Sequence, residues 1–400
     1  MKRFDVAIVG GGPAGSTLGL LLARSGCSVA VLERTDHSDF RIGESLPPAV
    51  EPRLRRLALW ERVVATHPQP VAGVLSAWGS DELHSSSFIT SPQLQGWHID
   101  RSRFDAALSA AAEQAGARVS RRCAVQALRR IQSGSWLLDL ASGPERSQLE
   151  AQFVVDASGR TAEIARKTGA HRVQIDNLVG ISSVFTKSES MHLPSLVEAR
   201  PDGWWYTAQL PDDRVVAIFF TDADVCAREG LTDPEVYRCL WQQTEHTRAR
   251  LNDAMPSGSL RVFPAATHRL YSASGDGWLA IGDAAIGRDP LSSSGIDFAL
   301  ASAERAFFAL QAIAAGDTHS LAAYDADLQR DFGAYIKQRT AFYSMEQRWP
   351  DAIFWARRRH GDVFALETTS SADFATKAQP AASRLQARHP GMPEASTDPQ

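Results

Sequence analysis

The segment 10-GGGPAG-15 constrains the fold of this chain more than any other, because it stands between two different apolar patterns. Before it, Asp5–Val9 is a short β-rich run, and after it, Pro13–Ser25 carries apolar residues at helical spacing. The run 28–34 then has the composition of a second strand. This order predicts a βαβ unit, which favours a parallel sheet with a right-handed crossover.

The three spaced glycines and one acid have separate predicted roles. Gly10 permits a tight turn, Gly12 lets the backbone approach a pyrophosphate, and Gly15 allows close packing of the helix on the strand. The helix N-terminus offers free N–H groups and its dipole to the phosphates. Glu33, at the end of the second strand, is placed to accept hydrogen bonds from ribose hydroxyls. Together these features predict a dinucleotide site.

Two later motifs favour FAD over NAD as that dinucleotide. The segment 99-IDRSRFDAAL-108 carries an R-x-x-F-D pattern that starts at Arg101. In 281-IGDAAIGRDPLSSSGIDFAL-300, Gly282 and Asp283 stand at a strand end and a helix follows. An acid at a strand end can hold a ribityl hydroxyl, and a helix N-terminus can stabilise negative charge on the N1–C2=O edge of a reduced flavin.

Charge and composition exclude several other classes of protein. The 400-residue chain has a formal net charge of −4 and no long basic run, which argues against nucleic acid or an anionic membrane as a partner. Its four cysteines show no metal-ligand spacing, so we expect reduced thiols and no metal. No stretch approaches ~18 uninterrupted apolar residues, and the apolar N-terminus is too short for a signal peptide. We therefore expect a cytoplasmic protein.

An alternating strand pattern interrupts the α/β pattern in the middle of the chain. The runs 180–187, 203–211 and 214–222 have the pattern of strands in an antiparallel sheet, and a helix is expected around Pro234–Asn252. The α/β pattern then resumes at 277–285. This organisation predicts a sheet layer inserted into an α/β domain.

The glycine motif with Glu33, the R-x-x-F-D segment, 156-DASGR-160 and the Gly282 motif together resemble the FAD-dependent aromatic hydroxylase superfamily. The stretch 41-RIGESLPP-48 resembles its halogenase-containing branch. The resemblance covers most of residues 1–360. It implies one non-covalently bound FAD, a sheet that covers the substrate, and reaction of the reduced flavin with oxygen to give a C4a-hydroperoxide.

The resemblance also implies the fold and its division. We expect an α/β fold in which a FAD-binding, Rossmann-like domain of the glutathione-reductase type carries an inserted antiparallel β-sheet substrate domain and a helical C-terminal segment. The expected divisions are the FAD-binding domain at 1–70, 96–175 and 265–335, the substrate sheet at 71–95 and 176–264, the C-terminal helical segment at 336–368, and a disordered tail at 369–400.

The residues expected to contact FAD come from all of these motifs. They are Gly10, Gly12, Pro13, Ala14, Gly15, Glu33, Arg34, Arg41, Gly43, Ser45, Arg101, Asp156, Gly282, Asp283, Pro290, Gly295 and Ile296. The chain has one GxGxxG, so we expect no separate NAD(P)H domain. NADH or NADPH as reductant, acting directly or through a separate flavin reductase, stays open.

Halogenation needs a lysine amine close to the 41–48 stretch, and this chain has none between Lys2 and Lys167. Arginine is no substitute, because guanidinium stays protonated and is a poor nucleophile. Two further departures from the halogenase pattern agree. Ser292 stands where tryptophan halogenases carry a glutamate, and 204-WWYTAQ-209 replaces their W-x-W-x-I-P. These departures favour a hydroxylase over a halogenase.

A hydroxylase mainly has to exclude water, orient an electron-rich ring and manage one proton. Backbone N–H groups around Ser293–Ile296 are expected to stabilise charge on the flavin. Among the aromatic residues of the inserted sheet, we expect Trp204, Tyr206 and Phe219 to line the substrate pocket. The alternative for each of them is an ordinary place in the sheet core.

The candidate catalytic residues are Glu44, Asp289, Ser294 and Gly295. Glu44 lies in the branch-specific stretch, where a structural salt bridge is the alternative to an acid–base role. Asp289 either faces the pocket or caps the turn before Pro290. His98 and His268 are isolated, which is more typical of structural histidines.

The resemblance implies an indole or phenol type of ring, as a free aromatic small molecule or as peptidyl tryptophan of a partner protein. The second possibility follows from maturation flavoproteins that oxygenate a peptidyl tryptophan in quinone-cofactor biogenesis. The segment 346-EQRWPDAIFWARRRH-360 is either a surface for such a partner or a closing helix. Three alternative functions stay open, namely a flavin-dependent halogenase, a flavin-dependent double-bond reductase and a non-catalytic flavoprotein assembly factor.

Overall fold

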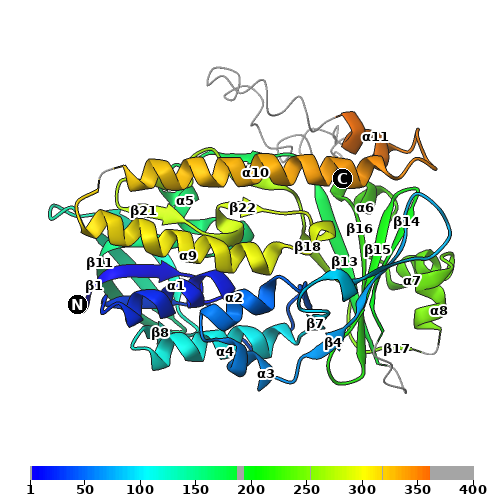
Figure 1. Ribbon diagram of the computed structural model, residues 1–400. Coiled ribbons are helices and arrows are strands. Elements are labelled where there is room, and N and C mark those ends of the chain that lie inside the picture. Colours follow the sequence, from blue (N-terminus) through cyan, green and yellow to red (C-terminus); the bar gives the residue numbers. More distant parts are fainter. Residues whose placement is uncertain (1, 187–192, 253, 318, 361–400) are drawn as a thin grey trace, which may run out of the picture.

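The computed structural model describes residues 2–186, 193–252, 254–317 and 319–360. Two parts lie side by side, a parallel sheet with its helices and a large antiparallel sheet, and the long helix α10 (Ser320–Ser344) runs across both (Figure 1). The predicted mixed α/β fold is confirmed. The predicted disordered tail at 369–400 and the end of the 336–368 segment lie outside the described residues.

The first sheet is built around the N-terminal strand. β1 (Lys2–Val9) pairs in parallel with β2 (Val29–Leu32) and β11 (Glu145–Asp156), and α1 (Pro13–Arg24) connects β1 to β2. The order is β20–β21–β11–β1–β2–β8, and β10 and β9 extend it beside β11. The remaining strands are β8 (Arg118–Ser120), β9 (Ala124–Arg130), β10 (Trp136–Ser142), β20 (Ser274–Gly275) and β21 (Trp278–Ala280).

Helix α1 is the centre of the helical layer. It begins at a proline, whose missing N–H costs nothing at a helix start, and it packs between α4 (Arg101–Gln114) and α9 (Gly295–Ala314). Its residues Ala14 to Leu20 are all buried, because neighbours cover α1 on several sides. The other helices of this part are α2 (Val50–Arg56), α3 (Trp60–Val64) and α5 (Glu163–Lys167).

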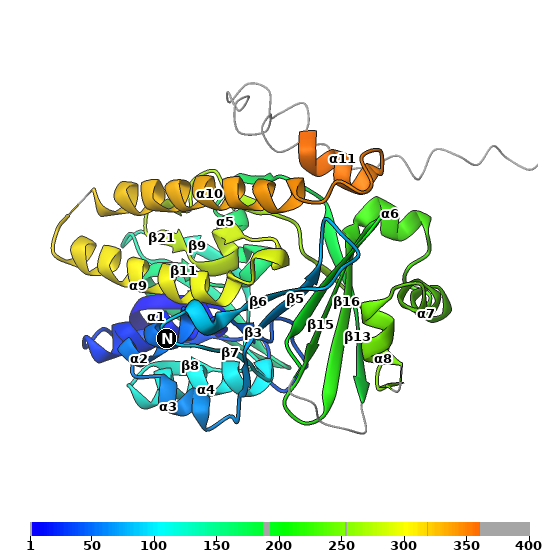
Figure 2. The same ribbon diagram turned by 45° about the vertical axis from the view of Figure 1, so that its right-hand side comes forward.

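The second sheet is antiparallel except where β14 pairs with β5. Its order is β17–β13–β16–β15–β14–β5–β6, and β18 also pairs with β13. Helices α6, α7 and α8 cover the face that points away from the first part (Figure 2). These elements are β5 (Gly73–Ala77), β6 (His84–Ser87), β13 (Leu178–Thr186), β14 (Ser195–Arg200), β15 (Gly203–Gln209), β16 (Arg214–Asp222), β17 (Met255–Pro256), β18 (Arg261–Pro264), α6 (Ala223–Arg228), α7 (Pro234–Gln242) and α8 (His246–Leu251).

Two small three-stranded sheets lie where the two parts meet. The first has the order β3–β7–β4 and the second β12–β19–β22. Their strands are β3 (Ser45–Leu46), β4 (Gln69–Val71), β7 (Gly96–His98), β12 (Arg172–Gln174), β19 (His268–Leu270) and β22 (Ile286–Gly287). The last helix, α11 (Ile353–His360), follows α10 and packs against it.

Three further observations concern disulfides, metal sites and membrane spans. All four cysteines carry free thiols. Within the described ranges, no group of histidine, cysteine and acidic side chains could hold a metal ion. A search of the same ranges for a helix with the length and apolar character of a membrane span finds none.

The single helix expected around Pro234–Asn252 is divided into α7 and α8, so that prediction is wrong in detail. The buried carboxylate of Glu198, on β14, accepts hydrogen bonds from the backbone N–H groups of Glu245, His246 and Thr247 at 3.0, 3.2 and 2.7 Å. A distant side chain therefore caps the start of α8, and the local pattern of the segment does not reveal it.

We expect Glu198→Ala to lower the free energy of unfolding by about 1–3 kcal/mol, because three N–H groups at the start of α8, one of them fully buried, lose their acceptor. Urea unfolding followed by far-ultraviolet circular dichroism measures this change. The matched control is Glu229→Ala, because Glu229 is exposed and pairs with its neighbour Arg228. Equal losses in the two variants would contradict the assigned role of Glu198.

Candidate functional site

The glycine loop between β1 and α1 is tight at its ends and open in its middle. A Cβ at Gly10 would lie 2.1 Å from the Ala157 carbonyl oxygen, and one at Gly15 would lie 1.9 Å from the Gly10 carbonyl oxygen. Gly10 also has a φ of +111°, which favours glycine. A Cβ at Gly12 would meet nothing within 4 Å. The second glycine therefore faces space that a phosphate group can enter.

The helix start behind this loop is free of side-chain caps. Gly12 is the N-cap residue of α1, and it has no side chain to accept the first N–H groups of the helix. Pro13 and Ala14 form the first turn. The geometry suits an anion, because N–H groups and the helix dipole point toward it.

Glu33 closes the loop on the other side. Its Oε2 accepts the Gly11 N–H at 2.7 Å, and its Oε1 accepts the N–H and the hydroxyl of Thr35 at 2.9 and 2.6 Å. Burial alone would raise the pKa of Glu33, but these hydrogen bonds and Arg41 outweigh it and leave that pKa below its ordinary value. Glu33 is thus an ionised acceptor beside the glycine loop. Arg34, the next residue, is exposed.

The R-x-x-F-D motif anchors the segment 40–46, which we call the strap. Asp105 is fully buried on α4 and binds both Arg101 and Arg41, with distances of 3.2 Å from Arg101 Nε to Oδ1 and 3.0 Å from Arg41 Nη1 to Oδ2. Arg101 Nη1 also donates to the Ile42 carbonyl at 2.7 Å. Gly43 has a φ of +106°, and a Cβ there would lie 2.5 Å from Arg101 Nη1. The strap therefore lies directly over Arg101.

Asp156 and Asp283, the acids at the ends of β11 and β21, differ in their exposure to solvent. Asp156 is fully buried, and its carboxylate accepts the N–H groups of Ser158 and Ala165 at 3.0 and 2.8 Å. It holds the turn after β11, and its cofactor contact stays a prediction. Asp283 is partly exposed and lies 3.3 Å from Arg160 Nε. Gly282, with a φ of +57°, packs closely on Ala14 of the glycine loop helix.

The loop 289–296 carries the predicted catalytic residues near α9. It contains the short turn Pro290–Ser292, then Ser293 in the left-handed region with a φ of +46°, and α9 begins at Gly295. The Ser294 hydroxyl contacts the Ser292 hydroxyl at 2.8 Å and Arg288 Nη1 at 3.2 Å. A Cβ at Gly295 would meet nothing within 4 Å, and Ile296 is buried in the first turn of α9. The backbone of Gly295 is therefore open to approach.

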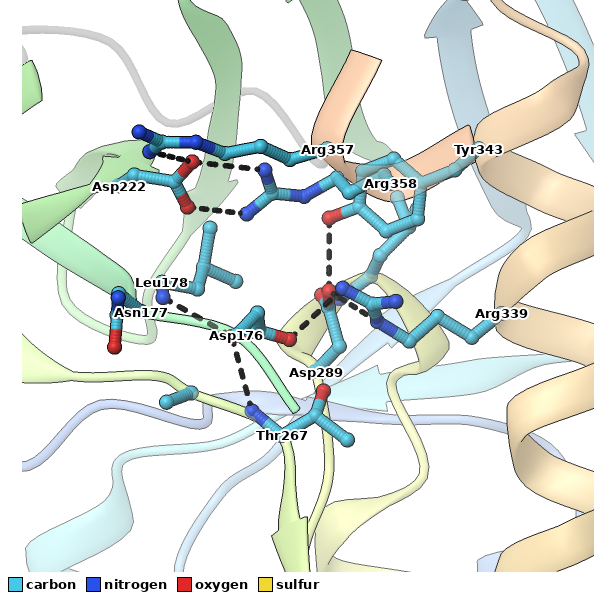
Figure 3. Close-up of polar contacts among 12 residues, drawn as sticks. Asp176, Asn177, Leu178, Asp222, Thr267, Asp289, Arg339, Tyr343, Arg357 and Arg358 are labelled. Atoms are coloured by element: carbon cyan, nitrogen blue, oxygen red, sulfur yellow. Dashed lines mark hydrogen bonds and ion pairs between the residues drawn. The ribbon is translucent and has the colours of Figure 1, made fainter. Parts of the chain in front are cut away.

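Asp289 is held by hydrogen bonds in a buried network, and its catalytic role stays a prediction. It is 1% exposed, and its Oδ1 accepts the Leu291 N–H at 3.0 Å. Its Oδ2 accepts hydrogen bonds from Arg339 Nε at 3.2 Å and from the Tyr343 hydroxyl at 2.8 Å (Figure 3). The alternative that the sequence left open, a turn-capping acid, is what the structure shows.

One face of the second sheet packs against the strap and the 289–296 loop. Trp204 stacks on Phe220 with ring centroids 4.2 Å apart, and both belong to an apolar cluster that also contacts Phe40, Ile42 and Leu291. We call this side the inner face. Its members include Trp204, Tyr206, Ile218, Phe220 and Phe263.

Phe219 lies on the opposite face, so its predicted place beside Trp204 and Tyr206 is wrong. β15 and β16 pair so that Trp204 stands opposite Phe220, and Trp205 opposite Phe219. Directly opposite residues share a face of a sheet. Phe219 therefore packs with Trp205 under the outer helices.

A buried polar cluster lies at the edge of the inner face. Glu44 is 2% exposed, and its Oε2 accepts the Gly43 N–H at 2.9 Å. The Tyr206 hydroxyl interacts with Glu44, Ser45 and Ser195. Burial raises the pKa of Glu44, and hydrogen bonds from Gly43 and Tyr206 offset only part of that rise. A carboxyl beside a tyrosine hydroxyl can hold or pass a proton.

His98 and His268, the two histidines considered in the sequence, are both buried and hydrogen-bonded. His98 Nε2 lies 2.8 Å from the Ser195 hydroxyl, and burial lowers the pKa of His98 to about 3. His268 Nε2 lies 3.0 Å from the Asp283 carbonyl oxygen, and burial with Arg172 lowers its pKa to about 4. Both rings are neutral at ordinary pH, which fits the structural alternative.

The segment 346–360 ends in the closing helix α11, and its arginines pair with groups of the protein itself. Arg358 is 2% exposed, and its Nη2 lies 2.7 Å from Asp222 Oδ1. Arg357 binds Asp222 and Asp224 at 3.0 and 2.8 Å. Trp355 is fully buried. The interpretation of this segment as a basic partner surface is therefore not supported.

No lysine of the described residues lies on the strap or the inner face. Lys2 begins β1, Lys167 donates to the Val125 carbonyl from α5, and Lys337 is exposed on α10. Lys187 and Lys377 lie outside the described residues.

Sequence reasoning missed the partners of Asp289. Tyr335, Arg339 and Tyr343 of α10 all contact it. Their spacing of four residues was a usable signal, because such residues share one helix face. Thr35, which donates two hydrogen bonds to Glu33, was also missed as a part of the site.

The chain matches the family model "FAD binding domain" over residues 3–332. It is 30% identical over 369 residues to the putative FAD-dependent oxidoreductase LodB of Marinomonas mediterranea, which covers 90% of this chain and 97% of LodB. The match to the myxobacterial chondrochloren halogenase CndH has a TM-score of 0.83 and 25% identity, over 90% of this chain and 86% of CndH.

A third similar protein is the peptidyl tryptophan dihydroxylase QhpG, essential for tryptophylquinone cofactor biogenesis. Its structure matches with a TM-score of 0.70 and 25% identity, over 89% of this chain and 79% of QhpG. The chain therefore belongs to the FAD binding domain family and fits its flavin-dependent-halogenase-like branch of oxidoreductases.

Proposed function

We propose that this protein is a FAD-dependent monooxygenase that inserts one oxygen atom from O2 into an electron-rich aromatic ring. The observation that carries the proposal is the inner face of the second sheet. It is aromatic, it packs against the strap and the 289–296 loop, and no lysine of the described residues lies on it. A halogenase would need such an amine there.

The residues present fit FAD. The uncapped start of α1 and the open space at Gly12 suit the pyrophosphate, and ionised Glu33 suits the ribose hydroxyls. Asp283 is partly exposed and suits a ribityl hydroxyl. The open backbone at Gly295 suits the pyrimidine edge of the ring. When bound, FAD supplies the activation of O2, which no side chain can supply.

The protein's own residues then have three tasks. The N–H groups at the start of α9, around Ser293–Ile296, stabilise negative charge that develops at their position. The inner face, with Trp204 and Tyr206, orients an aromatic substrate and excludes water. Glu44 takes up or returns the proton of the substituted ring, because its buried carboxyl contacts the Tyr206 hydroxyl. Glu44 is therefore the proposed acid–base residue.

The substrate class follows from the inner face and from the relatives. Aromatic walls suit an indole or phenol ring, either free or within a peptide. QhpG acts on a peptidyl tryptophan, and this similarity favours a peptidyl substrate on a partner protein here as well. We propose NADH or NADPH as the source of electrons, used directly or through a separate flavin reductase.

Incubation of the FAD-loaded protein with NADH, a flavin reductase, bromide and ¹⁸O2 tests this proposal. The probes are free tryptophan, a phenol and a tryptophan-containing peptide. We expect mass spectrometry to show one labelled oxygen atom in a probe and no bromine, because no lysine among the described residues lies on the strap or the inner face to carry an oxidised halide.

Other products would identify other functions. A brominated probe would make the protein a halogenase. A reduced double bond with no label would make it a reductase. Support of a partner's maturation by a variant that has lost FAD would make it an assembly factor.

The fit of FAD to the glycine loop predicts a selective effect of Gly12→Ala. We expect about tenfold weaker FAD binding or more, equivalent to ~1.4 kcal/mol, because the new methyl group occupies the pyrophosphate space. The apoprotein should keep its melting temperature, since that Cβ meets no protein atom within 4 Å. Fluorescence titration with FAD measures the binding. The matched control Gly333→Ala, also without a neighbour within 4 Å, should bind FAD normally. Equal binding by both variants would place the pyrophosphate elsewhere.

The raised pKa of Glu44 gives its substitution a pH-dependent effect. The folded protein holds the Glu44 proton more tightly than the unfolded chain does. Its contribution to stability is thus present below the ordinary pKa of 4.5 and is lost as the pH rises through the raised pKa. Glu44→Gln stays neutral and should become more stable relative to the unsubstituted protein as the pH rises above 4.5. Melting temperatures at several pH values check this, with exposed Glu82→Gln as control. A difference that does not change with pH would contradict the burial argument.

A further inference from the structure

A buried network joins α10 to the 289–296 loop and to the second sheet (Figure 3). We call it the α10 hub, and its members are Asp176, Asp289, Tyr335, Arg339 and Tyr343. Tyr335, Arg339 and Tyr343 stand four residues apart along α10, so they share one face of the helix. All three reach the same aspartate.

The hub holds Asp289 at three points. The Asp289 backbone N–H donates to the Tyr335 oxygen at 2.6 Å, and its Oδ2 accepts from Arg339 and Tyr343. The remaining oxygen, Oδ1, accepts the Leu291 N–H at 3.0 Å. α10 thus fixes Asp289, and Asp289 fixes the turn that follows it.

The backbone that follows this turn adopts a conformation that depends on support from its surroundings. Ser293 has a φ of +46°, in the left-handed region that non-glycine residues rarely adopt without support from their surroundings. Gly295 begins α9 two residues later. A turn that relaxes at Ser293 therefore moves the first N–H groups of α9.

The hub also binds the second sheet. Arg339 Nη2 lies 2.8 Å from Asp176 Oδ2, and Asp176 Oδ1 accepts the N–H groups of Leu178 and Thr267 at 3.0 and 3.2 Å. Leu178 starts β13, where the chain enters the second sheet, and Thr267 follows β18, where the chain leaves it. Arg339 therefore connects both crossing points to the 289–296 loop.

The inner face has its own contact with the hub. The Trp204 indole Nε1–H donates to the Tyr343 oxygen at 3.1 Å, while the Tyr343 hydroxyl donates to Asp289. Arg358 lies over the Tyr343 ring, 5.2 Å from its centroid. One hydroxyl thus joins the proposed substrate wall to the loop.

Stability alone does not explain the ion pair between Arg339 and Asp289, because burying two charged groups costs free energy. Arg339 and Asp289 side chains are each 1% exposed, and a buried ion pair is often no more stabilising than apolar residues of the same size. What such a pair does supply is one defined geometry.

We propose that Arg339 and Tyr343 are positioning residues that set the N–H groups of the 289–296 loop against the flavin ring and the inner face. This inference rests on the proposed function, since it requires FAD to be bound there.

The midpoint reduction potential of bound FAD tests the inference. A loosened loop stabilises the reduced, more negative flavin less, while it affects the oxidised flavin little. We expect Tyr343→Phe and Arg339→Lys to weaken binding of reduced FAD about tenfold relative to oxidised FAD, which lowers the two-electron potential by ~30 mV. Circular dichroism confirms that each variant is folded.

The matched control is Tyr324→Phe. Tyr324 is a buried tyrosine on the same helix, and its hydroxyl donates to the Ala280 carbonyl at 2.7 Å, outside the hub. This variant should lose comparable stability and keep the potential. Asp289→Asn supplies a double-mutant cycle, in which its effect and that of Tyr343→Phe on the potential should not add, because the Tyr343 hydroxyl reaches the loop through Asp289.

The outcomes separate the two proposals. An unsubstituted protein that does not bind FAD overturns the proposed function and this inference together. A protein that binds FAD, with unchanged potentials in Tyr343→Phe and Arg339→Lys, overturns the inference alone. Additive effects in the cycle also overturn it. Tyr343→Phe removes a single hydroxyl, so it decides the question even if Arg339→Lys does not fold.

Discussion

The guanidinium of Arg339, held between Asp176 and Asp289, is the interaction on which the arrangement of the two parts depends. Asp176 accepts backbone N–H groups at the two points where the chain crosses between the parts. Asp289 accepts the N–H of Leu291 and caps the turn before α9. Removal of one partner would leave a buried charge uncompensated, at a cost of about 3–5 kcal/mol. Because α10 lies across both parts, one helix face fixes the relative position of the 289–296 loop and the inner face (Figure 1).

The glycine loop and the strap depend on close contact in a different way. Gly10 and Gly15 leave no room for a side chain, whereas Gly12 and Gly295 face open space. The chain is therefore packed where its own elements meet and open where a cofactor must approach. Buried Asp105 holds the strap over α4 through Arg41 and Arg101. These local contacts define the candidate site. The strap has no lysine amine, and the inner face carries aromatic rings, and the proposed chemistry rests on both features.

The fold, the tight glycine loop and the contact between Arg101 and Asp105 were predictable because each depends on residues that are close together in the sequence. Gly10, Gly12 and Gly15 act within one turn, and Arg101 and Asp105 are one helical turn apart. Phe219 was placed on the wrong face because the pairing of β15 with β16 depends on the turn between them, where Asp212 and Asp213 both have positive φ. The buried network around Asp289 was missed because its partners Arg339 and Tyr343 stand about fifty residues further along the chain. The spacing of Tyr335, Arg339 and Tyr343 indicates one shared helix face, but one sequence does not show that this face meets Asp289.

Hydrogen–deuterium exchange with and without FAD tests the central claim most directly, because it reports on the two loops that are proposed to hold the two ends of the cofactor. The account predicts slower exchange on FAD addition for the amides of both the glycine loop, residues 11–15, and the start of α9, residues 293–296. Protection of the glycine loop alone, with unchanged exchange at 293–296, would contradict it, because the flavin ring would then lie away from the inner face.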